Sequence, residues 1–324
     1  MVRTLASSVA IEMDLRLEAA AAAQLRENTA HDPDYRVPEV DWRRTGRRVL
    51  TTERITGLPV QNVAALRAAG HDLAALATTV VQSFLRQALR DGFFHADLHQ
   101  GNLFVDDDGV LVAIDFGIMG QLDTRSRRFL AEILHGFLHA DYRRVAEVHI
   151  EAGYVPADKS VEAFSLACRS IGEPLAGQSA SEISIGRFLA QLFQITRTFD
   201  MHTQPQLLLL QKTMVMAEGM ALHLNPEANL WEIAEPVVEQ WMMDNLGPEA
   251  RLEQALTTAL RSIRHIPALF EQAEQAARIL TGEGIKLHPD TLRHLAREQA
   301  RARRPYYLAL GALGALAGVL WLVF

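Results

Sequence analysis

The chain has 324 residues, 49% of them hydrophobic, so it is long enough to bury a sizeable core in one large domain or two ordinary ones. Its formal net charge of −7 gives no reason to expect a nucleic-acid partner, which would call for a basic surface. A single cysteine, Cys168, excludes an intrachain disulfide framework and fits a reducing compartment.

The first part of the chain predicts a helix, two short strands and a second helix. Residues 4–28 are rich in alanine and favour a helix, without the apolar core and cleavage site of a signal peptide. The segments DYRVPEVDW (34–42) and RRVLTTERITG (47–57) look extended and suggest a pair of strands. From about 61 to 90 apolar residues recur at helical spacing, and Gly92 follows as a stop, so we expect one long helix.

The stretch FFHADLHQGNLFV, residues 93–105, places two histidines, an aspartate and an asparagine between apolar runs. Its last residues, LFV, and the later run VLVAI flank the turn DDDG, which is a strong hairpin signal. DFG follows directly at 115–117. Residues 123–283 read as helical, with breaks near GYVPADK, HTQPQ, LNPEANL and NLGPEA.

Three oxygen-bearing side chains are predicted to converge. Asp97 and Asn102 lie in a loop after a long helix, and the hairpin would return Asp115 to that loop. Mg²⁺ prefers hard oxygen ligands and usually takes one or two carboxylates together with substrate phosphates. A D-x-x-x-x-N loop followed by a hairpin and D-F-G is the pattern of the large lobe of protein kinases.

Simpler interpretations exist for each part. DFG occurs by chance, and Asp107-Asp108-Gly109 could be a solvated turn. A metal hydrolase could use His95, Asp97 and His99, but we find no second histidine cluster at ligand spacing in support. His95 is more simply a residue that orients the loop. The combined order of motifs is far more specific than any one of them.

The motifs resemble one known family. FFHADLHQGNLFV together with VAIDFGIMGQL is similar to the UbiB/aarF-domain family of atypical protein-kinase-like proteins, also described as ubiquinone-biosynthesis kinases. That family carries an H-A-D-P-H-P-G-N loop and an E-x-D-x-x-x-E helix, which EMDLRLE matches at residues 12–18. The resemblance runs from about residue 4 to 245, and the hydrophobic C-terminus is also family-like.

The resemblance implies roles for the loop residues. Asp97 corresponds to the catalytic-loop aspartate, with His95 in support. Asn102 corresponds to a magnesium ligand and Asp115 to the principal metal-binding aspartate. ATP and Mg²⁺ are therefore the expected cofactors.

It also implies roles for residues nearer the N-terminus. Glu18 corresponds to the helix glutamate that pairs with a nucleotide-contacting lysine, and Glu12 and Asp14 belong to the signature near the nucleotide. Asp14 and Glu18 are four apart and would share a helix face, whereas Glu12 would point elsewhere. Glu53 falls where the hinge between the lobes is expected. A solvated helix face is the alternative for the helix trio.

The sequence also departs from the family pattern. Leu98 and Gln100 replace two loop prolines, and Ala21 replaces an asparagine. The family's lysine lies on a strand ahead of the signature helix, but here the first lysine is Lys159. The chain therefore resembles an N-terminally truncated member, either begun inside a longer reading frame or a real shortened pseudokinase. We expect it alone to bind ATP poorly and turn it over negligibly.

The C-terminal segment predicts a membrane anchor. Residues 306–324 run without a charge, and at ~1.5 Å per residue they approach the ~30 Å thickness of a bilayer core. Tyr306, Tyr307 and Trp321 lie near its ends, and an arginine-rich flank that precedes it should stay cytoplasmic. A buried C-terminal helix is the alternative.

Taken together, the sequence predicts an α+β, protein-kinase-like fold with an incomplete small lobe, a large helical lobe and a C-terminal transmembrane helix. The expected divisions are the incomplete small lobe at 1–57, the helical large lobe at 58–245, a helical extension at 246–304 and the anchor at 305–324. DFGIMG leads almost directly into a helical pattern, without an A-P-E motif, so a small-molecule or lipid-linked substrate is expected over a peptide. The resemblance implies an atypical kinase or ATPase at the inner (cytoplasmic) membrane that supports ubiquinone biosynthesis, with membrane lipid, polyprenyl quinone precursors or quinone-biosynthesis proteins as partners. A catalytically inactive scaffold is the alternative.

Overall fold

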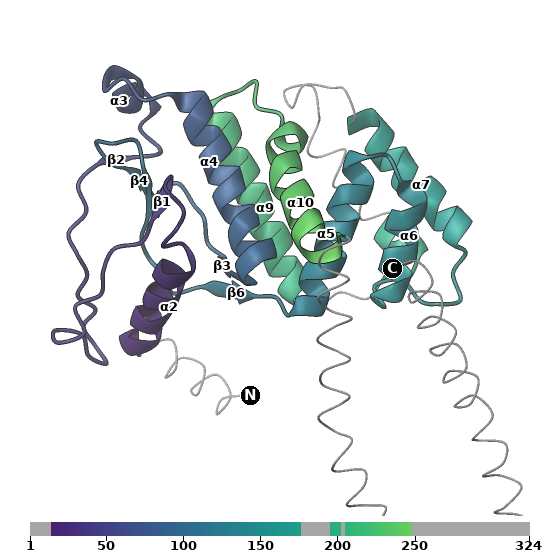
Figure 1. The fold of residues 1–324 in the computed structure, drawn as a ribbon, viewed down its shortest axis with the longest axis horizontal. Helices are drawn as coiled ribbons and strands as arrows, with labels where there is room; N and C mark the ends of the chain where they lie inside the picture. Colours follow the sequence, from purple (N-terminus) through teal and green to yellow (C-terminus); the bar gives the residue numbers. More distant parts are fainter. Residues whose placement is uncertain (1–13, 176–194, 202–204, 248–324) are drawn as a thin grey trace, which may run out of the picture. The chain divides into compact units, whose positions relative to one another are not determined.

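Two small β-sheets bring distant parts of the chain together in the computed structural model, which describes residues 14–175, 195–201 and 205–247 (Figure 1). The larger sheet has the order β1-β5-β4-β2, with β1 parallel to β5 and the other neighbours antiparallel. The smaller sheet pairs β3 with β6 in antiparallel fashion. The strand bounds are β1 Tyr35–Arg36, β2 Leu58–Pro59, β3 Phe93–His95, β4 Leu103–Val105, β5 Leu111–Ala113 and β6 Met119–Gln121.

The predicted hairpin is confirmed. Leu103 lies opposite Ala113, and Val105 lies opposite Leu111. Asp106 closes the turn because its Oδ1 accepts hydrogen bonds from the backbone N–H groups of Asp108 (3.1 Å) and Val110 (2.9 Å). The two strands thereby carry the loop before β4 and the segment after β5 to the same end of the hairpin.

The helices follow the sequence pattern only in part, and they dominate the rest of the described chain. Their bounds are α2 Leu15–Asn28, α3 Val63–Ala68, α4 Leu73–Arg86, the π-helical turn η1 Gln87–Asp91, α5 Thr124–Leu138, α6 Tyr142–Glu151, α7 Val161–Leu175, α9 Pro205–Leu224 and α10 Leu230–Leu246.

Two predicted helices need correction. The helix expected over 4–28 cannot run through Asp14, whose backbone is extended (φ −98°, ψ 90°) and whose side chain caps α2. The single helix expected over 61–90 is two helices and a π-turn. Gly70 adopts a positive φ of 87° after α3, and Asp72 then caps α4 by accepting from two backbone N–H groups. Gly92, at φ 64°, does end the segment as expected.

The predicted pair of N-terminal strands is also only partly correct. Their segments meet through a single bridge between Val40 and Thr52, supported by the bond from the Glu53 N–H to the Glu39 carbonyl at 2.7 Å. The longer pairing belongs instead to β1, which joins β5. A proline at 38 removes a backbone donor, which fits so short a pairing.

The main core lies where α4 packs against α9 and α10, which lie side by side in Figure 1. The buried face of α4 matches the expected helical spacing and includes Leu76, Val80 and Phe84. Side chains also tie the helices together: the Trp241 indole N–H of α10 donates to the Leu89 carbonyl at 2.8 Å. A second, smaller cluster around Phe164 joins α6 and α7.

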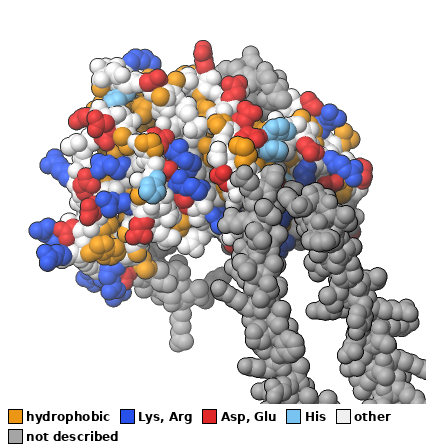
Figure 2. Space-filling model, viewed as in Figure 1, with side chains coloured by type: hydrophobic (Ala, Val, Ile, Leu, Met, Phe, Trp, Pro, Cys, Tyr) orange, Lys and Arg blue, Asp and Glu red, His pale blue; other side chains and the backbone are white. Residues whose placement is uncertain are grey.

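On the surface, charges of both signs are interspersed over the face drawn in Figure 2, rather than gathered by sign. No helix among the described residues is both long and apolar enough to cross a bilayer. The structure describes no residue from 248 onward, so the predicted anchor at 305–324 and nearly all of the predicted extension at 246–304 lie outside the described residues.

Candidate active site

The site begins in the loop between β3 and β4. This loop turns back on itself, because the His99 N–H donates to the Asp97 carbonyl at 2.8 Å and the Asn102 N–H donates to the His99 carbonyl at 2.9 Å. The Asn102 side chain closes the turn by donating from Nδ2 to the Asp97 carbonyl at 3.1 Å. Asn102 is only 4% exposed, so its amide has a fixed place. Asp97 and Asn102 are thereby held together, as the sequence predicts.

The segment after β5 joins this loop directly. The Ile114 N–H donates to the Asn102 carbonyl at 2.8 Å, one residue before Asp115. Asp115 is exposed and has a positive φ of 64°, a backbone conformation that non-glycine residues adopt uncommonly and that costs free energy. Asp115 Oδ1 accepts from the Gly117 N–H at 3.3 Å, within the same turn. The structure thus joins the backbone before Asp115 to the loop of Asp97 and Asn102, while the convergence of their side chains on one cation stays a prediction.

His95 links the two halves of the site. Its Nδ1 accepts from the Asp97 N–H at 3.2 Å, so the ring proton lies on Nε2, which faces the Ile114 carbonyl at 3.3 Å. The side chain is fully buried, and burial lowers the pKa of His95, which favours this neutral form. Gln87 of η1 accepts from the His95 N–H at 3.1 Å and fixes the strand. His95 therefore positions the loop relative to the DFG segment.

Those bonds exclude the metal-hydrolase alternative for this stretch. Both ring nitrogens of His95 are engaged by the backbone, so neither is left for a metal. His99 Nδ1 accepts from the Gly101 N–H at 3.0 Å, and its Nε2 lies 3.9 Å from Asp97 Oδ2. Leu98, which replaces a family proline, is buried and belongs to the core.

Glu18 of α2 reaches the DFG segment. Its Oε1 accepts from the Phe116 N–H at 3.2 Å. Burial raises the pKa of Glu18, and the nearby Asp115 carboxylate raises it further, while the Phe116 bond opposes both. Among the described residues no cation pairs with Glu18. The helix glutamate thus orders Phe116 and adds a second carboxylate close to Asp115.

Lys212 of α9 is a site residue that the sequence reasoning missed. Its Nζ donates to Asp97 Oδ1 at 2.9 Å, and this bond lowers the pKa of Asp97. Beside it, the buried Thr213 hydroxyl donates to the Ala96 carbonyl at 3.1 Å. The sequence feature that could have indicated it is the rarity of lysine. The chain has lysines only at 159, 212 and 286, and its other basic side chains of this kind are arginines.

Other predicted site residues lie elsewhere or cannot be placed. Glu12 lies outside the described residues. Asp14 caps α2 and pairs with Arg16 at 2.6 Å. Glu53 is exposed and pairs with Arg36 at 2.7 Å. No hydrogen bond or ion pair of the described chain connects Asp14 or Glu53 to the loop at Asp97.

The donor set fits a hard divalent cation. Asp115 supplies an exposed carboxylate. Asn102 supplies its amide oxygen, because its Nδ2 is already bonded to the Asp97 carbonyl. Asp97 supplies a further carboxylate, one oxygen of which accepts from Lys212. Mg²⁺ with a nucleotide phosphate needs few protein ligands, and these are of the right kind. The same carboxylate type can orient an attacking hydroxyl group during phosphoryl transfer.

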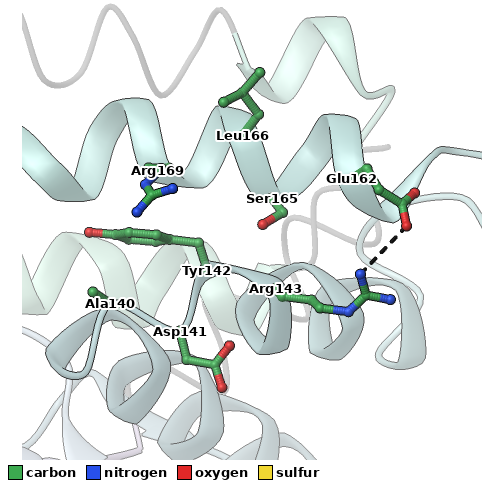
Figure 3. A pocket seen from close by; sticks show the side chains of 8 residues that line it. All are labelled: Ala140, Asp141, Tyr142, Arg143, Glu162, Ser165, Leu166 and Arg169. Carbon is green, nitrogen blue, oxygen red and sulfur yellow. Dashed lines mark ion pairs between the residues drawn. The ribbon is translucent and has the colours of Figure 1, made fainter.

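A separate hollow of about 380 Å³ lies between α6 and α7 (Figure 3). Arg169 lies over the Tyr142 ring at 5.8 Å, and Arg143 pairs with Glu162 at 3.6 Å. None of its lining residues belongs to the loop around Asp97. These two contacts join α6 to α7, whereas Asp141, which also lines the hollow, caps α6.

Comparisons with known proteins point to one family. Residues 1–149 match the ABC1 atypical kinase-like domain, and residues 168–229 match the UbiB helical domain. A probable protein kinase UbiB from Marinobacter nauticus is 38% identical over 325 residues, which cover 95% of this chain and 58% of that protein. One from Aeromonas hydrophila is 40% identical over 315 residues, or 95% of this chain and 57% of that protein. The chain therefore spans less than two thirds of these relatives.

A solved structure shares the fold. The complex of Rv3197 with erythromycin from Mycobacterium tuberculosis aligns with a TM-score of 0.53 over 73% of this chain and 60% of that one. At 20% identity this likeness concerns the fold alone. Together with the ABC1 match, it identifies the α+β architecture as kinase-like.

Proposed function

Because the chain belongs to the ABC1/UbiB family of atypical kinase-like proteins, we propose that its Asp97–Asn102–Asp115 site binds a magnesium–nucleotide complex and supports ubiquinone biosynthesis. The observation that carries this proposal is the backbone link between the loop and the DFG segment, from the Ile114 N–H to the Asn102 carbonyl at 2.8 Å. The activity that we propose for the family site is that of an atypical kinase or ATPase. The residues of this chain alone should bind ATP poorly and turn it over negligibly, because no lysine precedes Lys159.

Each residue has a chemical task in this proposal. Asp115 and Asn102 would hold Mg²⁺, which supplies neutralisation of phosphate charge when bound. Asp97 orients the attacking hydroxyl group or water through the oxygen that Lys212 leaves unbonded. Lys212 holds positive charge at the place where phosphate oxygens arrive. His95 and Glu18 position these groups by bonds to the backbone at 95–97 and 114–116.

A small or lipid-linked acceptor suits the site better than a peptide. β6 and α5 follow DFG almost at once, with α5 beginning at Thr124. Ordinary kinases use a long segment at this place to present peptides. We therefore propose polyprenyl quinone precursors or membrane lipid as the acceptor class, and the inner membrane as the site of action.

The proposal is tested by Asp115→Asn introduced at the chromosomal copy of the gene. Asparagine tolerates the positive φ at this position, so the fold should persist while the carboxylate is lost. We expect loss of growth on a carbon source whose use requires ubiquinone, with a fall in extracted quinone. Asp107→Asn, on the exposed hairpin turn, is the matched control and should grow like the parent. Normal growth of Asp115→Asn would argue against ATP chemistry.

A catalytically inactive scaffold is the second candidate. The environment of Glu18 favours it, because no cation among the described residues pairs with this glutamate and no lysine precedes Lys159. A scaffold predicts that Asp115→Asn grows normally while deletion of the whole gene does not. The growth comparison therefore separates the two candidates.

A further inference from the structure

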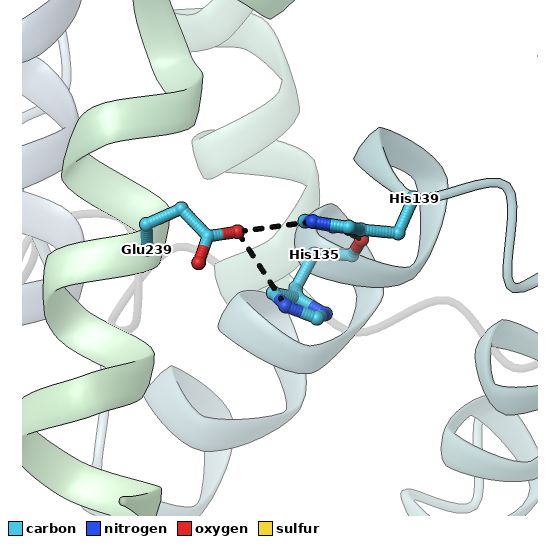
Figure 4. Close-up of side chains that lie close together, drawn as sticks. All are labelled: His135, His139 and Glu239. Carbon is cyan, nitrogen blue, oxygen red and sulfur yellow. Dashed lines mark hydrogen bonds and ion pairs between the residues drawn. The ribbon is translucent and has the colours of Figure 1, made fainter.

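A group of metal-ligating side chains lies where the end of α5 meets α10. His135 and His139 are one helical turn apart on α5 and its C-cap, and Glu239 projects from α10 toward both (Figure 4). The sequence reasoning overlooked this pair when it found no second histidine cluster at ligand spacing. An i, i+4 pair places both rings on one face of a helix.

The distances fit tetrahedral coordination. His135 Nε2 lies 3.5 Å from Glu239 Oε1, and His139 Nε2 lies 3.4 Å from the same oxygen. Zn²⁺ bonds to imidazole nitrogen and carboxylate oxygen at roughly 2.0–2.2 Å, so neighbouring ligand atoms in a tetrahedron are about 3.3–3.5 Å apart. The three ligand atoms all lie within 4.8 Å of one another. The two rings stack with their centroids 4.2 Å apart, so both must turn for their Nε2 atoms to bind one ion.

The tautomer of His139 favours a metal. Its Nδ1 lies 3.0 Å from the His135 carbonyl, which can only accept, so Nδ1 carries the proton. The lone pair is then on Nε2, the nitrogen that faces Glu239. A backbone carbonyl holding the far ring N–H is the usual support for a histidine that ligates zinc.

Glu239 supplies an independent observation. Its Oε1 is buried and accepts no hydrogen bond from the described residues, although a buried carboxylate oxygen normally has a partner. A cation placed between the three side chains would satisfy this oxygen.

The surroundings leave room for such an ion. A hollow of about 570 Å³ adjoins the cluster, and His135 and Glu239 are among its lining residues. Two arginines also line it, but both are paired with the buried carboxylate of Glu132, through Arg128 Nε at 2.6 Å and through Arg144. The hollow can hold the water that completes the coordination sphere.

We propose that His135, His139 and Glu239 form a binding site for Zn²⁺ that fastens α5 to α10. The ion takes two imidazole nitrogens and one carboxylate oxygen, and water completes the tetrahedron. The site is separate from the Asp97 loop, and it stands whether or not that loop binds a nucleotide.

The test titrates the purified full chain, stripped with a chelator, with Zn²⁺ in competition with a chromogenic chelator. We expect one tight equivalent in the parent and at least tenfold weaker binding in His139→Ala and in Glu239→Gln. Adding Zn²⁺ should raise the Tm of the parent and leave the Tm of these two variants unchanged. Co²⁺ as a probe should give the visible absorption of a tetrahedral N/O site. His31→Ala, at an exposed histidine of the same chain, and Asp115→Asn should both match the parent.

Each other result overturns the proposal. Absence of a tight equivalent in the parent leaves the cluster as a His–Glu ion pair. Equal loss in His31→Ala indicates non-specific binding, and loss in Asp115→Asn puts the ion in the DFG site. Circular dichroism checks that the variants are folded. If His139→Ala does not fold, Glu239→Gln decides the question, because glutamine keeps the shape of the side chain.

Discussion

Replacing His95 by alanine tests how the site is held together. The change removes the acceptor for the Asp97 N–H and the donor to the Ile114 carbonyl, at 3.2 and 3.3 Å, and it empties a fully buried position that packs on the Phe116 ring at 5.6 Å. Each lost hydrogen bond costs about 0.5–1.5 kcal/mol, and a buried group left without a partner costs about 1–3 kcal/mol. We expect His95→Ala to lower the free energy of unfolding by about 2–4 kcal/mol.

His95 also gives the protein a definite pH dependence. Burial holds its folded pKa below the ordinary value of 6.5, so the unfolded chain takes up a proton at a higher pH than the folded chain. The stability that neutral His95 contributes is therefore fully present above about pH 6.5 and is lost as the pH falls toward the folded pKa. One proton limits this slope to about 1.4 kcal/mol per pH unit.

Urea unfolding followed by circular dichroism at pH 7.5, 6.5 and 5.5 measures both effects. His95→Gln cannot take up the proton, so its stability should fall less than that of the parent between pH 6.5 and 5.5. His149 of α6 is half-buried and also has a lowered pKa, but it makes no contact with the loop around Asp97 that the described residues show. His149→Gln is therefore the matched control, since it removes a titrating histidine without changing the site. Equal slopes for parent and His95→Gln, or a loss below about 1 kcal/mol in His95→Ala, would refute the reasoning.

Three further changes probe the groups around His95. Lys212→Met should cost only about 0.2–1 kcal/mol at pH 7, because the lysine is 51% exposed. The pair lowers the pKa of Asp97, so this difference in unfolding free energy should begin to shrink below the ordinary carboxyl value of 3.8 and disappear only below the lowered pKa of the folded state. Urea unfolding at pH 7 and at pH 2 measures it, and an equal difference at both would contradict the reasoning. Glu18→Gln should leave stability at pH 7 unchanged or higher, since burial and Asp115 raise the pKa of this carboxyl, and a clear loss of Tm would count against that environment. Asp115→Gly should relieve the positive φ and raise the unfolding free energy by about 1 kcal/mol while abolishing metal-dependent nucleotide binding; calorimetry and metal titration together decide it.

Local signals explain what the sequence could predict. The Asp106–Gly109 turn between two apolar runs was enough to predict the hairpin. The hairpin in turn predicts that Asn102 lies next to the segment before Asp115. These contacts lie close in sequence, so turn chemistry and strand alternation suffice. The buried face of α4 was predictable for the same reason.

Contacts between distant segments were not predictable in this way. Lys212 reaches Asp97 from a helix that follows much later in the chain, and no local periodicity reports such a bond. Helix α2 begins after Asp14 because this residue caps it, and the helical segment is interrupted at Gly70 because of a positive φ. Helix propensity summed over a long window does not reveal such single-residue features. Glu239 meets His135 only because α5 packs on α10.

The most direct test of the central claim is Mn²⁺ binding, measured by electron paramagnetic resonance on the purified chain with and without ATP. Mn²⁺ stands in for Mg²⁺ at an oxygen site. We predict weak binding that ATP strengthens, and a loss of that ATP-dependent part by at least tenfold, or about 1.4 kcal/mol, in Asp115→Asn but not in Asp107→Asn. ATP-dependent binding that survives unchanged in Asp115→Asn, or that is absent from the parent, would contradict a magnesium–nucleotide site formed by Asp97, Asn102 and Asp115.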